Sequence, residues 1–389
     1  MVEEYNVFLR NGTWELGFHQ REGFDFTKTF SPVVKPSTIR LLLTLVVSLS
    51  WPLRQIDIQN AFLHGDLCEE VCMSQPPEFV DDSRLSHVCR LRKSLYGLKQ
   101  APHAWYSKLS SFLLDYGFTA NKVDSSLFIL RSDTHCLYIL VYVDDIILTG
   151  STHSAITDLI SAMESHFAVK DLGSLSFFLG IEVIQTPNGL FLNQRCYAQD
   201  LLERTVGDPF LDVPLYCSTA GALQYLLLTR PDFAFVLNKA CQYLQSPTFA
   251  HWSFVKHILR YLKSTVEFGL CITPSSITSM HIFSDSDWAG CPDYRCSQGS
   301  YCIFLGNNLH SWSSRKYATV SRSSTEAKYR SLALATSEAL WINSLFRELG
   351  FSLSCSPTLR YDNIGATYLS ANPVFHARTK HIEIDFHFV

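Results

Sequence analysis

Two adjacent carboxylates, Asp144 and Asp145, separate two apolar segments, 136–143 and 146–149, that are rich in Ile, Leu, Val and Tyr. Apolar runs joined by so short a connection predict a β-hairpin with the two Asp residues at its tip. Asp is common in turns, so a solvated turn is one interpretation of the pair. Two carboxylates on a buried hairpin are costly unless a cation or solvent neutralises them, so a metal site is the other.

A third carboxylate, Asp57, lies in a similar apolar segment, 54–58. If this segment forms a strand beside the hairpin, Asp57 reaches Asp144. Carboxylate sets of this kind hold two Mg²⁺ ions about 4 Å apart, which activate a 3′-hydroxyl and stabilise a leaving pyrophosphate. The three residues therefore point to metal-dependent nucleotidyl transfer.

The segments that must position these carboxylates alternate between helical and extended patterns. Apolar residues at helical spacing predict helical structure within 38–50, 95–116, 198–205, 221–264 and 323–349. Apolar and β-branched runs predict strands at 54–58, 136–143, 146–149, 177–184, 190–193, 280–287, 300–305 and 358–361. Residues 273–276 have the composition of a linker. Strands, then helices, then a further set of strands indicate two domains with a helical segment between them.

Composition restricts the classes of protein that fit. The 389 residues are 47% hydrophobic and 17% charged, which predicts a globular chain of two or three domains. A formal charge of −4 argues against a dedicated DNA-binding domain, although a nucleic-acid enzyme can confine its basic residues to one groove. The twelve cysteines form no CxxC pair, and without a secretory signal they indicate reduced thiols in an intracellular protein. The longest apolar run, 41–53, is too short for a membrane span.

Ten ordered sequence blocks resemble the Pol polyprotein of copia-type LTR retrotransposons. Seven are similar to its reverse transcriptase region: FSPVVKPSTIR at 30–40, QIDIQNAFLHGDL at 55–67, SLYGLKQAPHAWY at 94–106, YVDD at 142–145, DLGSLSFFLGIEV at 171–183, GALQYLLLTRPDFAF at 221–235 and HWSFVKHILRYLKST at 251–265. Three look like its RNase H domain: HIFSDSDWAG at 281–290, SRSSTEAKYRSLALATSEALW at 321–341 and YDNIGATYLS at 361–370. An unrelated metal hydrolase that uses the Asp pair would leave the other blocks unexplained.

The resemblance implies an α+β or α/β multidomain fold with four parts. These would be a remnant N-terminal and fingers segment at 1–30, a fingers–palm domain with an antiparallel sheet at 31–195, a shortened helical thumb or connection at 196–272, and a C-terminally truncated, mixed α/β RNase H-like domain at 278–389. The implied activities are those of an RNA-directed DNA polymerase and a ribonuclease H, each with two Mg²⁺ per active site and Mn²⁺ as a substitute.

The resemblance also implies partners. These would be an RNA template, a DNA primer, dNTPs and an RNA–DNA hybrid, with no membrane. The location would be intracellular, either in the cytoplasm within a virus-like particle or in the nucleus, and the oligomeric state stays open.

In the reverse transcriptase region, the resemblance assigns the chemistry to three palm carboxylates. Asp57, Asp144 and Asp145 would be catalytic and metal-binding, with Asp57 and Asp144 the direct ligands. Phe62 matches an aromatic gate against the ribose 2′-hydroxyl, or else is a plain core residue, and Gln100 and Tyr142 would line the nucleotide pocket. The basic residues that would serve a template–primer groove, or else form a solvated surface, are Arg92, Lys93, Lys99 and Lys108.

In the RNase H region, Asp285 and Asp362 match catalytic, metal-binding positions, whereas Asp287 matches no catalytic role. The helix between them has Lys328 where the family has its catalytic Glu. A Lys beside the metals reverses the charge there, and we expect it to abolish metal binding. Glu326 could replace the missing Glu only if the register of the helix slipped.

Three further departures weaken the expected activity. Leu16 runs directly into Gly17, where the family has a fingers strand whose Lys and Arg hold the triphosphate. The stretch 205–216 is short, and the chain ends at Val389, before the family's last catalytic Asp. We therefore expect a degenerate copy with impaired activity. The alternative is a non-catalytic nucleic-acid-binding or structural remnant of a transposon polyprotein.

Three residues near the chain end receive no catalytic assignment. His376 and His381 could form a metal pair, but lone histidines are more often structural or lie on the surface. Asp385 precedes the segment in which the family has its final Asp.

Overall fold

The computed structural model describes residues 20, 26–75, 83–84, 87–205, 213–276, 279–291 and 294–371. The chain divides into two compact units, which are described separately. Unit 1 consists of Met1–Val34, Arg54–Asn121 and Ser125–Gly173, and unit 2 of Lys35–Leu53, Lys122–Asp124 and Ser174–Val389. Most of the expected N-terminal remnant at 1–30, together with His376, His381 and Asp385, lies outside the described residues.

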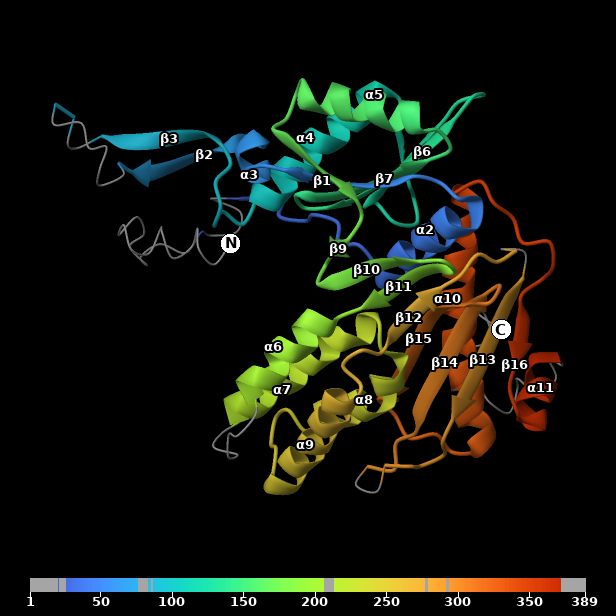
Figure 1. The fold of residues 1–389 in the computed structure, drawn as a ribbon. Helices are drawn as coiled ribbons and strands as arrows, with labels where there is room; N and C mark the ends of the chain where they lie inside the picture. The colour runs from blue at the N-terminus through green and yellow to red at the C-terminus, as the bar shows by residue number, and fades with distance from the viewer. Residues whose placement is uncertain are drawn as a thin grey trace. The chain divides into compact units, whose positions relative to one another are not determined.

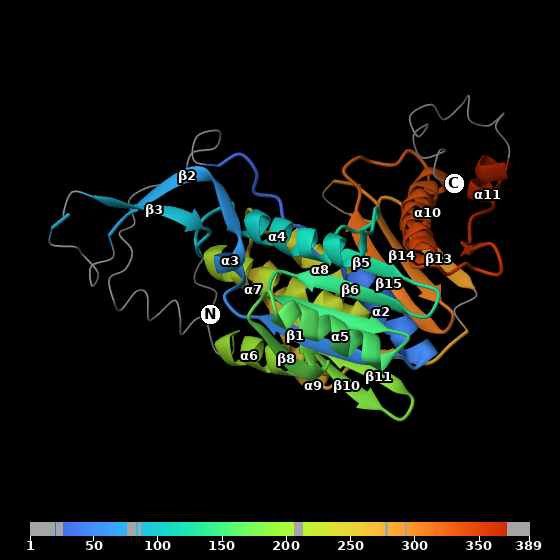
Figure 2. The ribbon, with the colours of Figure 1, turned by 90° about the horizontal axis from the view of Figure 1, so that it is seen from above.

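A six-stranded sheet forms the body of unit 1 (Figure 1). Its strands, in spatial order, are β4 (Thr119–Ala120), β5 (Leu127–Arg131), β6 (Cys136–Tyr142), β7 (Asp145–Gly150), β1 (Leu53–Ile58) and β8 (Val169–Ser174). The helices α4 (Ala101–Tyr116) and α5 (His153–Glu164) cover one face of this sheet (Figure 2). Alternate strand residues such as Ile56, Ile139 and Ile146 are fully buried in one core with Leu109 and Leu159 of the two helices. The period of two along each strand places these side chains on the helix-covered face.

A two-stranded hairpin extends from the same unit. It consists of β2 (Asp66–Ser74) and β3 (Val88–Lys93), which pair antiparallel after the short helix α3 (Ala61–His64). No sequence pattern predicts this hairpin, because its side chains are half-buried or exposed and its strands lack a strong apolar pattern. The helix predicted from residue 95 starts only at Ala101, since Gly97 takes φ +94° and Pro102 lies in the first turn.

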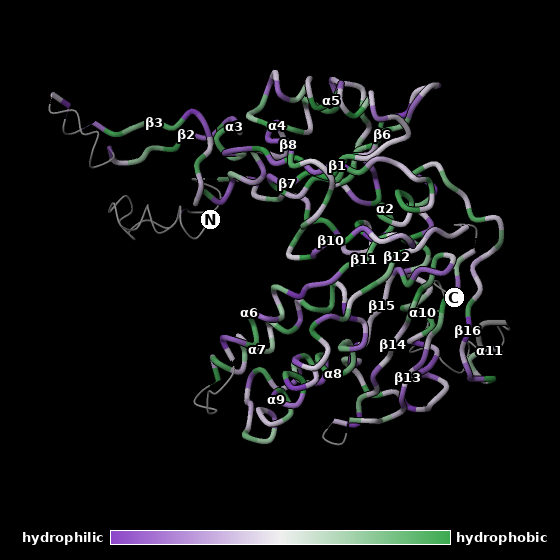
Figure 3. Tube along the Cα trace, in the orientation of Figure 1, coloured by the Kyte–Doolittle hydropathy of each residue, from purple (hydrophilic) through white to green (hydrophobic). Residues whose placement is uncertain are grey.

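Unit 2 contains a helical cluster and a four-stranded sheet. The helices are α6 (Arg195–Thr205), α7 (Val213–Tyr225), α8 (Ala234–Cys241) and α9 (Phe249–Ser264), with the short 3₁₀ turns η2 (Leu226–Leu228) and η3 (Pro231–Phe233) between α7 and α8. Hydrophobic and hydrophilic residues both occur along α6 and α9, as helices with one buried face require (Figure 3). The sheet has the order β12-β11-β10-β9, from β9 (Phe177–Phe178), β10 (Ile181–Thr186), β11 (Gly189–Asn193) and β12 (Gly269–Ile272).

The C-terminal part of unit 2 is a second four-stranded sheet with the order β15-β14-β13-β16. Its strands are β13 (Met280–Ser286), β14 (Gln298–Leu305), β15 (Asn308–Lys316) and β16 (Thr358–Arg360). The long helix α10 (Ser324–Glu348) packs on β13 and β14, and α11 (Ile364–Ala371) follows β16. The N-terminal helix α2 (Pro36–Leu49) also belongs to this unit, where it contacts β15.

The expected mixture of α and β structure with several antiparallel sheets is confirmed. The helices predicted within 38–50 and 323–349 correspond to α2 and α10, and the strands predicted at 280–287 and 300–305 correspond to β13 and β14. The assignment of fingers, palm, thumb and RNase H roles to these elements stays a prediction.

Candidate functional sites

The carboxylates of unit 1 come together because β1 lies directly beside β7. The Ile58 amide donates to the Asp144 carbonyl oxygen at 3.0 Å, so the residue after Asp57 is bonded to the hairpin. The turn between the strands differs by one residue from the predicted one. Tyr142 pairs with Asp145, so the two turn residues are Val143 and Asp144, and Asp145 is the first residue of β7.

The backbone of this turn is strained, and a hydrogen bond from α4 stabilises it. Val143 has φ +54°, in the left-handed region that a β-branched residue rarely occupies. The Trp105 indole Nε1 donates to the Val143 carbonyl oxygen at 2.7 Å. Such conformations persist only where the surrounding structure imposes them, and they cluster at functional sites. Trp105 on α4 therefore fixes the turn that carries Asp144.

The three carboxylates of unit 1 influence one another electrostatically. Burial, followed by the charge of Asp144, raises the pKa of Asp57, against the opposing effect of Lys170. Burial and then the charge of Asp144 also raise the pKa of Asp145, although a hydrogen bond from Gln55 opposes this. The Gln55 amide lies 3.4 Å from Asp145 Oδ1. Crowded carboxylates of this kind are stabilised by a nearby cation.

The side chains at this site have the oxygen donors that a divalent ion requires, but their arrangement meets only part of the geometry that such an ion needs. Carboxylate oxygens are the ligands that Mg²⁺ prefers, and Asp57 on β1 and Asp144 in the turn before β7 offer them. Within the described residues, however, no group of three or more His, Cys, Asp or Glu side chains is arranged to hold a metal ion. Asp57 and Asp144 are therefore the candidate ligand pair, and Asp145 lies beside them against Gln55.

The predicted nucleotide residues lie around the neighbouring elements. The ring of Phe62 on α3 packs against Tyr96 with 4.8 Å between centroids, and Tyr142 is half-buried at the end of β6. Gln100 is buried just before α4, where its Oε1 accepts from Gln20 Nε2 at 2.9 Å. It also lines a cavity of about 490 Å³ with Lys28 and other polar side chains, but the three carboxylates are not among the residues that line it.

Two of the basic candidates for a template–primer groove are paired to one carboxylate. Lys108 Nζ lies 2.9 Å from Asp66, and Lys93 Nζ also donates to that carboxylate. The hydrogen bonds from Lys93 and Lys108 lower the pKa of Asp66. No local sequence pattern reveals this role of Asp66, because the two cations lie far from it in sequence, on β3 and α4.

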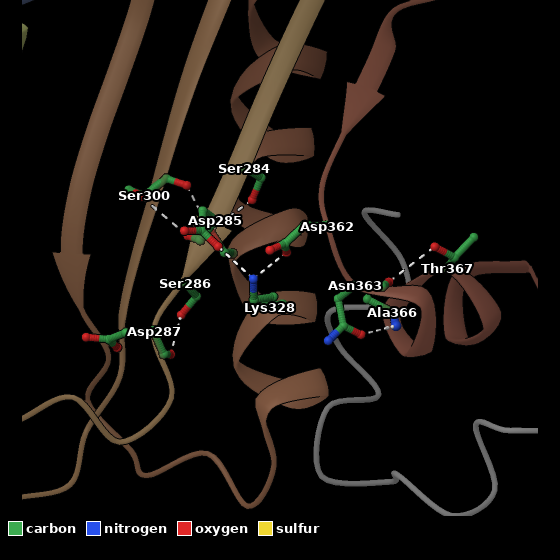
Figure 4. Close-up of polar contacts among 11 residues, drawn as sticks. Ser284, Asp285, Ser286, Asp287, Ser300, Lys328, Asp362, Asn363, Ala366 and Thr367 are labelled. Carbon is green, nitrogen blue, oxygen red and sulfur yellow. Dashed lines mark hydrogen bonds and ion pairs between the residues drawn. The ribbon is translucent and has the colours of Figure 1, made fainter.

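A second pair of carboxylates meets in unit 2. Asp285 lies near the end of β13 and Asp362 just after β16, and parallel pairing of these two strands, with Phe283 opposite Arg360, brings the two side chains together. Lys328 of α10 points between them (Figure 4). Its Nζ lies 2.9 Å from Asp285 Oδ1 and also donates to Asp362 Oδ1.

Charge pairing controls protonation in this second cluster. Burial lowers the pKa of Lys328, but the hydrogen bonds to Asp362 and Asp285 outweigh it, and the net shift is upward. The hydrogen bond from Lys328 lowers the pKa of Asp362. The Lys328 ammonium and the Asp362 carboxylate therefore stay charged together over a wide pH range. A divalent cation does not fit between carboxylates that an ammonium already bridges.

The structure does not bring Glu326 to this cluster. Its side chain is 5% exposed, lies 2.8 Å from Arg330 Nη2 and accepts from the Arg322 amide at 2.8 Å. Asp287 likewise has a local role, because its Oδ1 accepts from the Gln298 amide at 2.6 Å. Glu326 is therefore occupied at the start of α10, in the register that the sequence predicts.

Unit 2 also contains a buried cluster around Arg40 of α2 that the sequence does not predict. Its Nε donates to the His310 carbonyl oxygen at 2.6 Å and its Nη1 to the Leu228 carbonyl oxygen at 3.0 Å, while Trp312 lies under its guanidinium. Burial lowers the pKa of Arg40 to about 9, against the charge of Glu338. These residues are far apart in sequence, so no local pattern reveals them.

In the described part of the chain, no helix has both the length and the apolarity needed to cross a membrane.

Comparison with known proteins gives a consistent result along the chain. Residues 12–206 match the family described as reverse transcriptase (RNA-dependent DNA polymerase). Over 96% of its length, the chain is 47% and 46% identical to retrovirus-related Pol polyproteins from transposons RE2 and RE1 of Arabidopsis thaliana. It is 35% identical, again over 96% of its length, to the polyprotein from transposon TNT 1-94 of Nicotiana tabacum. The chain spans 27% of each Arabidopsis polyprotein and 30% of the tobacco one.

Proposed function

Because the chain belongs to the reverse transcriptase family and is a fragment of a retrotransposon Pol polyprotein of the copia type, we propose that unit 1 carries an RNA-directed DNA polymerase site of impaired activity. One observation carries this proposal. The β1–β7 pairing places Asp57 next to the hairpin turn of Asp144, through the 3.0 Å bond from Ile58 to the Asp144 carbonyl oxygen.

Asp57 and Asp144 would hold the divalent cation, either Mg²⁺ or Mn²⁺. When bound, such ions activate the primer 3′-hydroxyl and stabilise the leaving pyrophosphate. The protein's own contribution is positional. Trp105 holds the turn that carries Asp144, and Gln55 orients Asp145 beside it. Both constraints come from rigid elements, as precise transfer of a nucleotide requires.

The remaining polymerase residues would contact the nucleic acid and the dNTP. Phe62 would discriminate against a ribose 2′-hydroxyl, and Gln100 and Tyr142 would face the incoming nucleotide. An RNA template and a DNA primer are the substrates that the family implies. Binding of the triphosphate would be weak, because Leu16 runs directly into Gly17 where the family has the strand whose cations hold the triphosphate, and because Asp66 engages both Lys93 and Lys108.

The sheet of β13, β14, β15 and β16 with α10 supports an RNase H-like origin for the C-terminal part of unit 2. We propose that it has no nuclease activity toward an RNA–DNA hybrid, because Lys328 bridges Asp285 and Asp362. This favours a second candidate function for that part, a non-catalytic remnant that binds nucleic acid or has a structural role. An intracellular location, in a virus-like particle or the nucleus, is part of the same proposal.

Primer extension tests the polymerase proposal. Purified protein would be given poly(rA)/oligo(dT) and dTTP with Mg²⁺ or Mn²⁺, beside Asp144→Asn and a matched control, Asp158→Asn, on the exposed surface of α5. We expect weak incorporation that Asp144→Asn abolishes and Asp158→Asn leaves unchanged. If the folded protein incorporates nothing with either metal, the polymerase proposal fails and the non-catalytic alternative holds.

A further inference from the structure

The contacts of Lys328 join three elements of unit 2. Its ammonium reaches Asp285 at the end of β13 and Asp362 in the segment before α11, and Lys328 itself lies in the second turn of α10 (Figure 4). The Lys328 side chain is 18% exposed, whereas the two carboxylates are 69% and 72% exposed. The Lys328 ammonium is therefore largely shielded from solvent, whereas the Asp285 and Asp362 carboxylates are exposed.

This arrangement is the inverse of an ordinary surface ion pair. In such a pair a long basic side chain extends into solvent, loses side-chain entropy when it is fixed and gains little stability. Here the Lys328 side chain is largely enclosed, and one ammonium satisfies two carboxylates that would otherwise repel each other. Removing it would leave two like charges facing each other with no counter-ion.

The segment that carries Asp362 is fixed by further bonds. Asn363 Oδ1 accepts from the Ala366 amide at 2.8 Å and so caps the first turn of α11. The backbone of Asp285, on β13, is held from α10. Ser331 lies one turn after Lys328 on that helix, and its Oγ donates to the Asp285 carbonyl oxygen at 2.8 Å. The backbones of both carboxylates are thus positioned by bonds that do not involve Lys328.

We infer that the Lys328 ammonium takes the place of a divalent ion. By binding both Asp285 and Asp362, it joins β13, α10 and the segment before α11 without a metal. A carboxylate at position 328 would complete a three-carboxylate divalent site in the same place. The inference rests on the geometry of unit 2 and does not depend on polymerase activity in unit 1.

Mn²⁺ binding tests this inference directly in a protein whose candidate metal site in unit 1 has been removed. A background protein with Asp57→Asn and Asp144→Asn would be titrated with Mn²⁺ and followed by electron paramagnetic resonance. Lys328→Glu, Lys328→Gln and the matched charge reversal Arg347→Glu, at an exposed position in the last turn of α10, would be compared in this background. We expect Lys328→Glu alone to gain a Mn²⁺ site, which the background, Lys328→Gln and Arg347→Glu should all lack.

Thermal unfolding gives a second readout. We expect neither Mn²⁺ nor a chelator to shift the melting temperature of the background protein, and we expect Lys328→Gln to melt at a lower temperature because its carboxylates lose their counter-ion. For Lys328→Glu, Mn²⁺ should raise the melting temperature.

Two results would overturn the inference. One is a background protein that binds Mn²⁺ at a site which Asp285→Asn removes, a test that needs no change at position 328. The other is a folded Lys328→Glu protein, judged by circular dichroism, that gains no Mn²⁺. A polymerase that fails in primer extension would leave both results unaffected.

Discussion

Replacing His310 with leucine should make the unfolding free energy of unit 2 less dependent on pH. His310 lies on β15 with 1% of its surface exposed, and within the described residues neither ring nitrogen has a hydrogen-bond partner. Burial, followed by the positive charge of Arg40, lowers the pKa of His310 to about 3. The imidazole is therefore neutral in the folded protein at every pH above that value.

The magnitude follows from linkage between protonation and folding. In the unfolded chain a histidine has a pKa of about 6.5, so below that pH the unfolded state binds a proton that the folded state does not. Stability is therefore lost progressively as the pH falls from about 6.5 toward 3. Between pH 7 and pH 5 this single group should cost about 2 kcal/mol of unfolding free energy.

Urea unfolding followed by tryptophan fluorescence at pH 7 and pH 5 measures this cost. Leucine is close to histidine in size, and the bond from Arg40 goes to the backbone oxygen of residue 310, so it can persist in His310→Leu. We expect the wild type to lose about 2 kcal/mol more than His310→Leu between the two pH values. His257→Leu, at an exposed position on α9, is the matched control and should keep the wild-type loss. Equal losses in the wild type and His310→Leu would refute the reasoning, because they would mean that the folded protein protonates His310 freely.

Three further predictions concern unit 1 and the helices of unit 2. Gly150→Ala should destabilise the protein by about 2 kcal/mol in urea unfolding, because a Cβ there would clash with the backbone oxygen of Cys136. Gly221→Ala on α7, where a Cβ meets open space, should instead stabilise the protein by up to about 1 kcal/mol. Since the pKa values of Asp57 and Asp145 are raised, Mn²⁺ affinity measured by calorimetry should fall as the pH is lowered from 7 and these carboxylates become protonated. Binding that does not depend on pH would contradict the assignment. Asp66→Asn should lower stability by less than about 1 kcal/mol, since its partners are exposed, and 1 M salt should reduce the difference; a larger loss that salt leaves unchanged would show a buried role.

The sequence is sufficient to predict the fold where strongly apolar strands position the candidate catalytic residues. The segments around Asp57 and Asp144 are apolar enough to predict neighbouring strands, and β1 does lie beside β7. It was insufficient where long-range packing decides the outcome. The mixed polar hairpin of β2 and β3, and the membership of α2 in unit 2, have no local signal. The sequence shows the charge reversal at Lys328, but the bridging of Asp285 and Asp362 by Lys328 depends on how β13, β16 and α10 meet.

The central claim is that Asp57 and Asp144 form a cation site through the pairing of β1 with β7. Mn²⁺ binding to the otherwise unmodified chain, measured by electron paramagnetic resonance, tests it most directly, with Asp57→Asn and Asp144→Asn as variants and Asp158→Asn as the control. We expect a Mn²⁺ site that each of the first two substitutions weakens and that the control preserves. Mn²⁺ binding that is the same in all four folded proteins would contradict it.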